Sequence, residues 1–433
     1  MGNCNFKTEY DNDNVAQVTK SHFLFHYVIG RGGFGKVWKV EKKKEKKLFA
    51  MKEMHKGRVI SKRSVNSVMN EKKFLSQLRH PFLVNMHFAY QDRENLYLVI
   101  DLMPGGDLRY HFAKHRKFTE EQTKFFMVCM MLCLEYLHGK SILHRDIKPE
   151  NLVFDDDGYM RITDLGIARV WNPDNAKDTS GTPGYMAPEV MCRQNHGVAV
   201  DYFAVGVIGY ECMYGKRPYI GKNRKEIRDH ILSKQVQIRR NEVPAGWSLE
   251  AADFINKLIQ RKPINRLGLN GPEEVKNHVW FKDYKWDDVL NKKIKSPFIP
   301  PKEDNFDAKY TNSEWKDNNE EQMRQNSLLL RRQSVQALFN GYYHDEKIQN
   351  TANKNSNVIE EHIPQGPSVN SSTTNEVSNN NSNMNIKKNE GGDSSSQASS
   401  QQQDYKDSSR RAGGPPGGVQ KKSSIRQDSF SQI

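Results

Sequence analysis

The segment HRDIKPEN, at residues 144–151, constrains the fold of this chain more than any other stretch of its sequence. It brings a carboxylate, an ammonium group and a side-chain amide into one short run. A glycine-rich stretch, GRGGFGKVWKV, lies upstream of it, and the triplets DLG, at 164–166, and APE, at 187–189, lie downstream. Side chains of these kinds act together only when they meet at one site. The fold must therefore bring these separate segments together.

The residue types in these segments suit the transfer of a γ-phosphoryl group to a hydroxyl. That reaction needs metal ions across the phosphates, a carboxylate that orients the hydroxyl, and cations that stabilise the moving group. Asp146 is placed to accept the hydroxyl proton, and Lys148 reaches the transferring phosphate along an extended loop. Asn151 and Asp164 supply the oxygen ligands that Mg²⁺ prefers.

The glycines Gly30, Gly32, Gly33 and Gly35 lie beside a predicted strand. Because glycine lacks a Cβ, such a turn brings backbone N–H groups close to an anion, most often a phosphate. A dinucleotide-binding domain would continue into a helix, whereas VWKV at 37–40 predicts a strand. We expect strand, turn and strand, then a third strand ending in Lys52. A plain hairpin turn explains the glycines alone equally well, and the downstream segments favour a phosphate.

In this order and spacing the segments resemble the signature set of the protein kinase family. Over residues 23–310 the chain resembles the AGC group, to which the cAMP-dependent protein kinase catalytic subunit belongs. NEKKFLSQLRHPFLVNM, ENLYLVIDLMPGGDLRYH and WDDVLNKKIKSPFIPP carry this further resemblance. The triplet DLG departs from the commoner DFG, and GGDLRYH resembles the YANK branch, whose usual triplet is DFN. The subfamily therefore stays open.

The resemblance implies an α+β fold with two lobes. The kinase domain would span 23–281, with a small β-rich lobe and helix αC at 23–100 and a larger, mainly helical lobe at 101–281. An AGC-type tail, 282–345, would wrap back onto the small lobe. Residues 1–22 would form an N-terminal extension. Residues 346–433 are rich in Asn, Ser and Gln, and we expect disorder there because such a segment buries too little apolar surface.

The resemblance also implies catalytic and nucleotide-binding roles. Lys52 would pair with Glu71 of helix αC, and Thr182 in GTPGY would contact Asp146 and Lys148. Leu165 would fill the apolar slot of the usual phenylalanine. The cofactors would be ATP and Mg²⁺. The residues implied to contact ATP are Ile29, Gly30, Gly32, Gly33, Phe34, Gly35, Val37, Ala50, Lys52, Ile100 as gatekeeper, Asp101, Met103, Asp107, Glu150, Val153, Thr163 and Phe306.

Structural and regulatory roles follow from the same resemblance. Asp201, in an apolar helix, would hold the HRD backbone, and Glu189 would form a buried ion pair with Arg266. The position of an activating phosphothreonine falls at or near Asp178, beside Thr179. A phosphate there would pair with Arg145, and Asp178 itself already carries one negative charge, so the loop could be ordered without phosphorylation.

Basic substrates are expected from three carboxylates. Asp107, Glu150 and Glu211 match positions that receive arginines two and three residues before the acceptor in the cAMP-dependent enzyme, through bidentate pairing. The chain carries such a sequence itself, RRQSV, so Ser334 is a predicted autophosphorylation site. A basic segment that is never phosphorylated is the competing interpretation, since short basic motifs match often by chance.

Composition limits the other function classes. The net charge is +14, with a sequence pI near 9.3, which raises nucleic acid or an anionic membrane as partners. The basic residues are spread along the chain, however, and no zinc-finger or helix-turn-helix spacing accompanies them, so we expect a solvated surface and no nucleic-acid partner. The five cysteines form no CxxC pair, which favours a reducing compartment and no structural metal.

The N-terminal sequence, MGNCNFKTEY, bears on location. Removal of the first methionine would expose Gly2 for myristoylation, and Cys4 could take a second acyl chain, which together bind membrane stably. Phe6 departs from the Ser or Thr of the motif, so an ordinary start explains the segment equally well. We expect an intracellular, cytoplasmic chain, peripheral to membranes if acylated.

The function expected from the sequence is that of a serine/threonine protein kinase acting as a monomeric catalytic chain. It would transfer phosphate from Mg·ATP to proteins with basic residues before the acceptor. A pseudokinase scaffold that binds nucleotide and docks partners is the alternative, although every catalytic position is intact. Nucleic-acid binding through charge is a third class, and it predicts strongly salt-dependent binding to any duplex.

Overall fold

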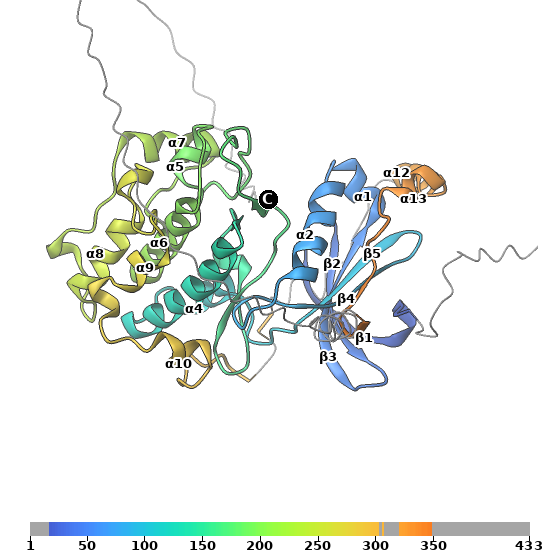
Figure 1. Ribbon diagram of the computed structural model, residues 1–433, viewed down its shortest axis with the longest axis horizontal. Helices are drawn as coiled ribbons and strands as arrows, with labels where there is room; N and C mark the ends of the chain where they lie inside the picture. Colours follow the sequence, from blue (N-terminus) through green and yellow to red (C-terminus); the bar gives the residue numbers. More distant parts are fainter. Residues whose placement is uncertain (1–16, 303–304, 307–319, 349–433) are drawn as a thin grey trace, which may run out of the picture. The chain divides into compact units, whose positions relative to one another are not determined.

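The computed structural model describes residues 17–302, 305–306 and 320–348, without the side chains of 320–323. The predicted acylation residues Gly2 and Cys4 lie outside the described residues, as does 349–433. Two lobes are formed by residues 17–302, and the segment 320–348 packs against the smaller one (Figure 1).

The small lobe is built on an antiparallel sheet whose six described strands run in the order β1-β2-β3-β5-β4-β10. Their bounds are β1 (Phe23–Arg31), β2 (Gly35–Lys42), β3 (Lys47–His55), β4 (Met86–Gln91), β5 (Asn95–Ile100) and β10 (His344–Asp345). The glycine-rich turn joins β1 to β2, and the charged run EKKKEKK forms the next hairpin. The expected strand, turn and strand are present.

The third strand is longer than predicted. It does not end at Lys52 but continues to His55, because Glu53, Met54 and His55 pair in register with Tyr97, Leu96 and Asn95 of β5. Lys52 therefore lies inside a strand that is paired on both sides. This pairing fixes the origin of its side chain.

Two helices complete the small lobe, α1 (Lys56–Ser61) and α2 (Val65–Gln77). The helix α2 buries Val68, Phe74 and Leu75 against the core, and Glu71 lies buried on the same helix. The position of Glu71 is therefore set by the apolar face that anchors α2.

The large lobe is mainly helical. Its helices are α3 (Leu108–His115), α4 (Glu120–Gly139), α5 (Pro188–Met191), α6 (Ala199–Tyr214), α7 (Arg224–Ser233), α8 (Leu249–Leu258), α9 (Pro272–Lys276) and α10 (Trp286–Leu290). Two short antiparallel strand pairs lie beside them, β6 (Ile142–Leu143) with β9 (Arg169–Val170), and the hairpin of β7 (Leu152–Phe154) with β8 (Met160–Ile162). The helices α4 and α6 form the centre of its core, and Cys129 and Cys133 are fully buried in α4. The predicted α+β, two-lobed fold is confirmed.

The C-terminal tail adds α12 (Glu320–Leu329), α13 (Gln333–Ala337) and β10 to the small lobe. Figure 1 shows α12 and α13 beside α1, and the two rings of Phe339 and Tyr342 are fully buried. The described chain continues three residues past the boundary predicted at 345. Glu346 pairs with Arg79 and His87, and Lys347 pairs with Glu45, so these charges hold the chain in place beyond β10.

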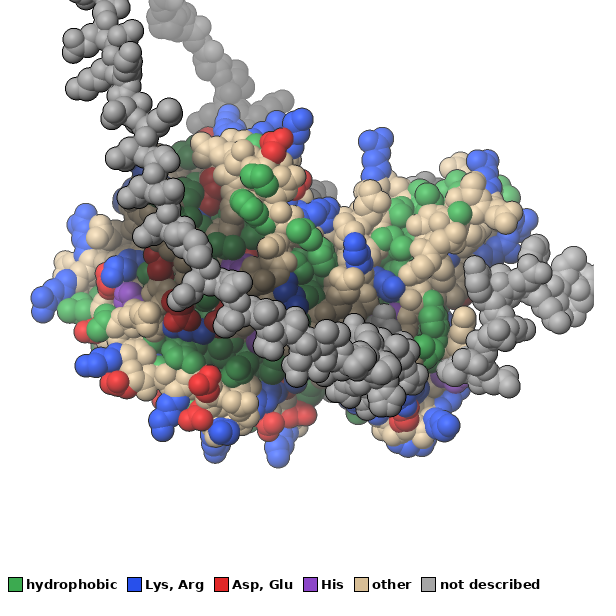
Figure 2. Space-filling model, viewed as in Figure 1, with side chains coloured by type: hydrophobic (Ala, Val, Ile, Leu, Met, Phe, Trp, Pro, Cys, Tyr) green, Lys and Arg blue, Asp and Glu red, His purple; other side chains and the backbone are tan. Residues whose placement is uncertain are grey.

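Basic and acidic side chains are interspersed on the face drawn in Figure 2, in line with the solvated surface expected from the sequence. A separate search for membrane spans, limited to the described residues, found no helix with the length and apolar character needed to cross a bilayer.

Candidate active site

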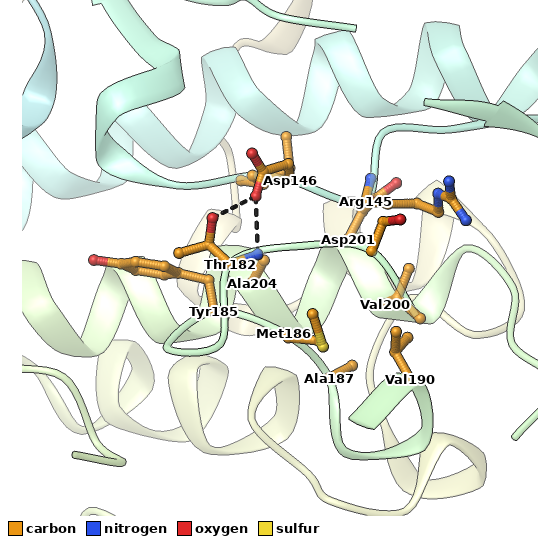
Figure 3. A pocket seen from close by; sticks show the side chains of 12 residues that line it. Arg145, Asp146, Thr182, Tyr185, Met186, Ala187, Val190, Val200, Asp201 and Ala204 are labelled. Carbon is orange, nitrogen blue, oxygen red and sulfur yellow. Dashed lines mark hydrogen bonds between the residues drawn. The ribbon is translucent and has the colours of Figure 1, made fainter. Parts of the chain in front are cut away.

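The loop that carries HRDIKPEN converges with the segment that carries GTPGY. The backbone N–H and the hydroxyl of Thr182 donate to Asp146 Oδ1, at 3.1 and 2.7 Å (Figure 3). Lys148 Nζ lies 2.7 Å from Asp146 Oδ2 and donates to Thr182 Oγ1 at 3.1 Å. These three predicted catalytic residues therefore form one hydrogen-bonded group, in which Asp146 is oriented by contacts to both of its oxygens.

The loop geometry depends on Asp201, in α6. Its carboxylate accepts from the backbone N–H of His144 at 3.0 Å and from that of Arg145 at 2.8 Å. Arg145 has a φ of 68°, a conformation that costs free energy for a residue with a side chain. Burial raises the pKa of Asp201, but hydrogen bonding from His138 outweighs it and holds that pKa below its usual range. A charged Asp201 is therefore available to fix this strained turn.

The two predicted metal ligands offer oxygens that the chain itself leaves available. Asn151 Nδ2 donates to the backbone oxygen of Asp146 at 2.9 Å, which leaves the amide oxygen as an acceptor. Asp164 Oδ1 accepts from Gly166 N at 3.0 Å, and the Lys52 ammonium holds the pKa of Asp164 below its usual range. An amide oxygen and an ionised carboxylate suit Mg²⁺, so the residues present fit this ion.

Lys52 is held by a helix of the small lobe. Its Nζ lies 2.9 Å from Glu71 Oε1 and 3.0 Å from Oε2. Burial lowers the pKa of Lys52, but the carboxylates of Glu71 and Asp164 outweigh it and raise that pKa above its usual range. The ammonium therefore stays charged where an anion would lie.

A cavity of about 240 Å³ joins these groups to the glycine-rich turn. Its lining includes Gly32, Gly33, Phe34, Gly35, Val37, Lys52, Glu71 and Asp164. A Cβ at Gly35 would lie 1.8 Å from the backbone oxygen of Glu53, so the fold itself requires glycine there. At Gly32 a Cβ would meet nothing within 4 Å, which leaves that stretch of backbone open to a ligand. Gly30 and Ile29 lie at the end of β1.

The predicted adenine contacts lie where the two lobes join. Ala50 is paired with Ile100 across β3 and β5, and Met103 is buried three residues on. The side chain of Asp101 is held by His87 and Arg161, at 2.7 and 2.9 Å, so any contact of Asp101 with a nucleotide falls to its backbone. Two further predicted contacts, Val153 and Thr163, lie in β7 and directly after β8.

The tail reaches this junction at residues 305–306. Asn305 Nδ2 donates to the backbone oxygen of Pro104 at 3.2 Å, and Phe306 follows directly. The chain therefore places the predicted Phe306 contact beside the segment that connects the lobes.

Two further predicted pairs are present. Arg145 Nη1 lies 3.2 Å from Asp178 Oδ2, and the arginine side chain is only 4% exposed. Burial lowers the pKa of Arg145, and the Asp178 carboxylate opposes this. Arg266 forms a bidentate, fully buried pair with Glu189, at 2.6 and 3.0 Å. Removing one partner of such a pair costs about 3–5 kcal/mol, so the pair fixes the end of the segment between DLG and APE, residues 164–189, which we call the activation segment.

The three carboxylates predicted to bind substrate arginines are not equally open. Glu150 and Glu211 are both paired with Arg109 of the chain itself, each at 2.9 Å. Asp107 caps α3, where it accepts from Tyr110 N at 2.8 Å. The pKa of Asp107 is raised to about 6, and burial is the largest cause of this rise. Arg109 was not identified as a functional residue from the sequence. Its position in GGDLRYH, two residues after Asp107, is the signal that could have shown it.

Ser334 lies away from this group of residues. It is exposed on α13, which contacts the small lobe through Gln336: Lys56 Nζ donates to Gln336 Oε1 at 2.7 Å. The predicted autophosphorylation site is therefore accessible, but within a helix that is docked on the small lobe.

Comparisons with known proteins identify the family of this chain. The family model described as the protein kinase domain matches residues 23–281. Protein kinase 2 of Dictyostelium discoideum is 37% identical over 288 residues, which cover 66% of this chain and 59% of that protein. Serine/threonine-protein kinase sgk-1 of Caenorhabditis elegans is 35% identical over 303 residues, 69% of this chain and 64% of that protein. Serine/threonine-protein kinase Sgk1 of Gallus gallus is 36% identical over 301 residues, 69% of this chain and 68% of that protein.

The fold and the site define a protein kinase domain. The chain belongs to the protein kinase family, and its relatives place it in the AGC group. It covers less than two thirds of the length of the first two relatives named above.

Proposed function

We propose that this chain is a serine/threonine protein kinase that transfers the γ-phosphoryl group of Mg·ATP to hydroxyls of protein substrates. One observation carries the proposal: Lys148 contacts both Asp146 and Thr182, and the Asn151 side chain donates to the backbone oxygen of the same Asp146. The names of the relatives, which are serine/threonine kinases, support the choice of acceptor.

The mechanism follows from the contacts of these side chains. Asp146 Oδ1 is oriented by Thr182, so this carboxylate can accept a hydrogen bond, and then the proton, from an acceptor hydroxyl. Lys148 lies beside Asp146 and can stabilise negative charge on the group in transfer. Lys52, fixed by Glu71, would bind the phosphates nearer the nucleoside. Asn151 and Asp164 would hold Mg²⁺, which would supply positive charge to the phosphates when bound.

The substrate class belongs to the same proposal. Asp107, Glu150 and Glu211 support proteins with basic residues before the acceptor Ser or Thr. Autophosphorylation at Ser334 would use this preference. Since α13 is docked, the reaction would need either release of this helix or a second molecule. Mass spectrometry after incubation with Mg·ATP tests this, and an unmodified Ser334 alongside labelled substrates would reject it.

The location and assembly are proposed on the sequence alone. The chain would act in the cytoplasm as a monomeric catalytic unit, with acylation of Gly2 and Cys4 holding it at membranes. Mass spectrometry of the N-terminal peptide tests the acyl chains, and sedimentation of the purified chain tests the monomer.

Transfer of radiolabel to a basic peptide tests the activity. Wild type should label the peptide, and Asp146→Ala should lower turnover by about a thousandfold, because the hydroxyl loses its proton acceptor. Retained nucleotide binding, measured as a thermal shift with Mg·ATP, would show that the variant is folded. Equal labelling by both proteins would overturn the mechanism. Nucleotide binding without transfer by wild type would favour the pseudokinase scaffold.

A further inference from the structure

Arg109 occupies the place expected for an arginine of the substrate. Its Nε lies 2.9 Å from Glu150 Oε1, its Nη1 lies 2.9 Å from Glu211 Oε1, and its Nη2 contacts the hydroxyl of Tyr185. All three nitrogens of the guanidinium group thus have a partner. One guanidinium thus bridges two carboxylates, with one contact to each, as a substrate guanidinium bound between them would.

The pair with Glu211 is the deeper of the two. The side chain of Glu211 is 7% exposed, whereas that of Glu150 is 45% exposed. Tyr185 donates to the second oxygen of Glu211 at 2.5 Å, so both oxygens of this carboxylate have partners within the chain. Withdrawing Arg109 would leave a buried carboxylate without its counter-ion, which is strongly unfavourable.

A second guanidinium gains little at this place. Glu150 and Glu211 together carry two negative charges, and Arg109 already neutralises one and takes up an oxygen of each. An incoming arginine would have to displace Arg109 or lie against another cation. The remaining carboxylate, Asp107, accepts from the backbone of α3 and forms no ion pair among the described residues, so it stays available.

We propose that Arg109 acts as a built-in replacement for one of the two substrate arginines, so that this kinase selects arginine at one position before the acceptor and not at both. The proposal rests on the proposed kinase activity. The subsite between Glu150 and Glu211 is closed by the chain itself, and Asp107 is left to select the single arginine. At the closed position, alanine and arginine are accepted equally.

The chain supplies its own test peptide. A synthetic peptide centred on RRQSV, and two versions with either the first or the second arginine replaced by alanine, separate the two positions. For wild type, one alanine peptide should be phosphorylated within about twofold of the parent kcat/KM, and the other should fall at least about tenfold. A tenfold fall with both alanine peptides would overturn the proposal.

Replacement of Arg109 should open the closed subsite. Arg109→Met keeps the aliphatic stem and removes the charge, so both alanine peptides should now fall at least about tenfold below the parent. Arg109→Lys keeps a cation there and should behave as wild type. Arg240→Met removes an exposed charge in the segment that follows α7. It controls for net charge and should leave the selectivity unchanged. Unchanged selectivity in Arg109→Met, in a protein that still phosphorylates the parent peptide, would also overturn the proposal.

Binding separates this proposal from the activity on which it rests. Fluorescence polarisation of labelled peptides, with Mg·ADP present, reports the subsites without phosphoryl transfer. Arg109→Met should bind the parent peptide at least about tenfold more tightly than either alanine peptide, even if wild type transfers no phosphate. If Arg109→Met shows this tenfold difference between peptides but no phosphate is transferred, the proposed activity alone is rejected. If Arg109→Met unfolds at the wild-type temperature but does not bind the parent peptide more tightly than the alanine peptides, the role of Arg109 is rejected.

Discussion

Lys52 Nζ donates to both carboxylate oxygens of Glu71, at 2.9 and 3.0 Å, and so joins strand β3 of the small lobe to helix α2. The pair couples two elements that the sequence separates by a turn and a short helix. The position of α2 therefore decides whether the ammonium faces the cavity it shares with Asp164.

Glu71→Gln tests this coupling. The amide keeps the shape of the side chain but cannot balance the ammonium, so Lys52 should turn away from α2 toward Asp164 and lose its present position in the cavity. We expect kcat/KM for ATP to fall about a hundredfold, the effect of losing one preorganised charge contact. Glu94→Gln, on an exposed turn of the same lobe, should have no effect. A Glu71→Gln enzyme with wild-type kinetics would contradict a role for the pair.

Asp107 gives a pH dependence. Because its pKa is raised to about 6 in the folded chain, the carboxyl group is mostly neutral at pH 5 and mostly charged at pH 7. Only the charged form attracts a substrate arginine, so kcat/KM for the peptide with both arginines should rise about tenfold between pH 5 and pH 7. Asp107→Asn should remove this rise and lower the value at pH 7.

The same shift has an opposite effect on stability. A carboxyl group whose folded pKa lies above its unfolded value favours folding at low pH, and this contribution is lost as the pH rises from near 4 through about 6. The free energy of unfolding of Asp107→Asn should therefore lack a decrease that wild type shows over that window. Urea titrations at pH 4.5 and 7 measure it. An identical pH dependence in both proteins would contradict the raised pKa.

The motifs could be predicted from the sequence, because each combines its residues within a few positions of the chain. HRDIKPEN places Asp146, Lys148 and Asn151 on one loop, and their contacts with each other follow from that short separation. The alternating pattern likewise predicted the strands beside the glycine-rich turn.

The contacts between distant segments could not be predicted in this way. Arg109 meets Glu150 and Glu211 because three helical segments of the large lobe pack together, and no local pattern encodes that packing. The addition of β10 to the edge of the sheet is similar, since pairing of His344 with Ala89 depends on where the tail docks. The extra length of β3 arises from pairing with β5 rather than from its own residues.

Asp178→Ala tests whether a carboxylate orders the activation segment. Arg145 is almost fully buried, so removal of Asp178 leaves a buried guanidinium without its counter-ion. We expect the segment to move and kcat to fall about tenfold, in an assay with the basic peptide. Asp178→Glu should restore most of the activity, and Asp174→Ala, an exposed change on the same segment, should have none of this effect. Unaltered turnover in Asp178→Ala would exclude ordering by this charge.

Docking of the tail should support α2. Phe339 is fully buried against the small lobe, and the centroid of its ring lies 5.2 Å from Lys56 Nζ. Lys72 of α2 donates to the backbone oxygen of Gly341 at 3.0 Å. Phe339→Ala removes a buried ring, at a cost of about 3–5 kcal/mol, which we expect to exceed the free energy that holds so short a segment in place. The tail would then leave the lobe, and α2 would lose its contact through Lys72.

Two measurements follow the change. Hydrogen exchange should increase across residues 324–348, and kcat/KM for ATP should fall several-fold, because α2 carries Glu71. Leu338→Ala is the matched control, since this neighbouring side chain is 48% exposed and its truncation removes little buried surface. A Phe339→Ala protein whose tail exchanges faster while its kinetics stay at the wild-type level would show that the tail stabilises the lobe without positioning Glu71.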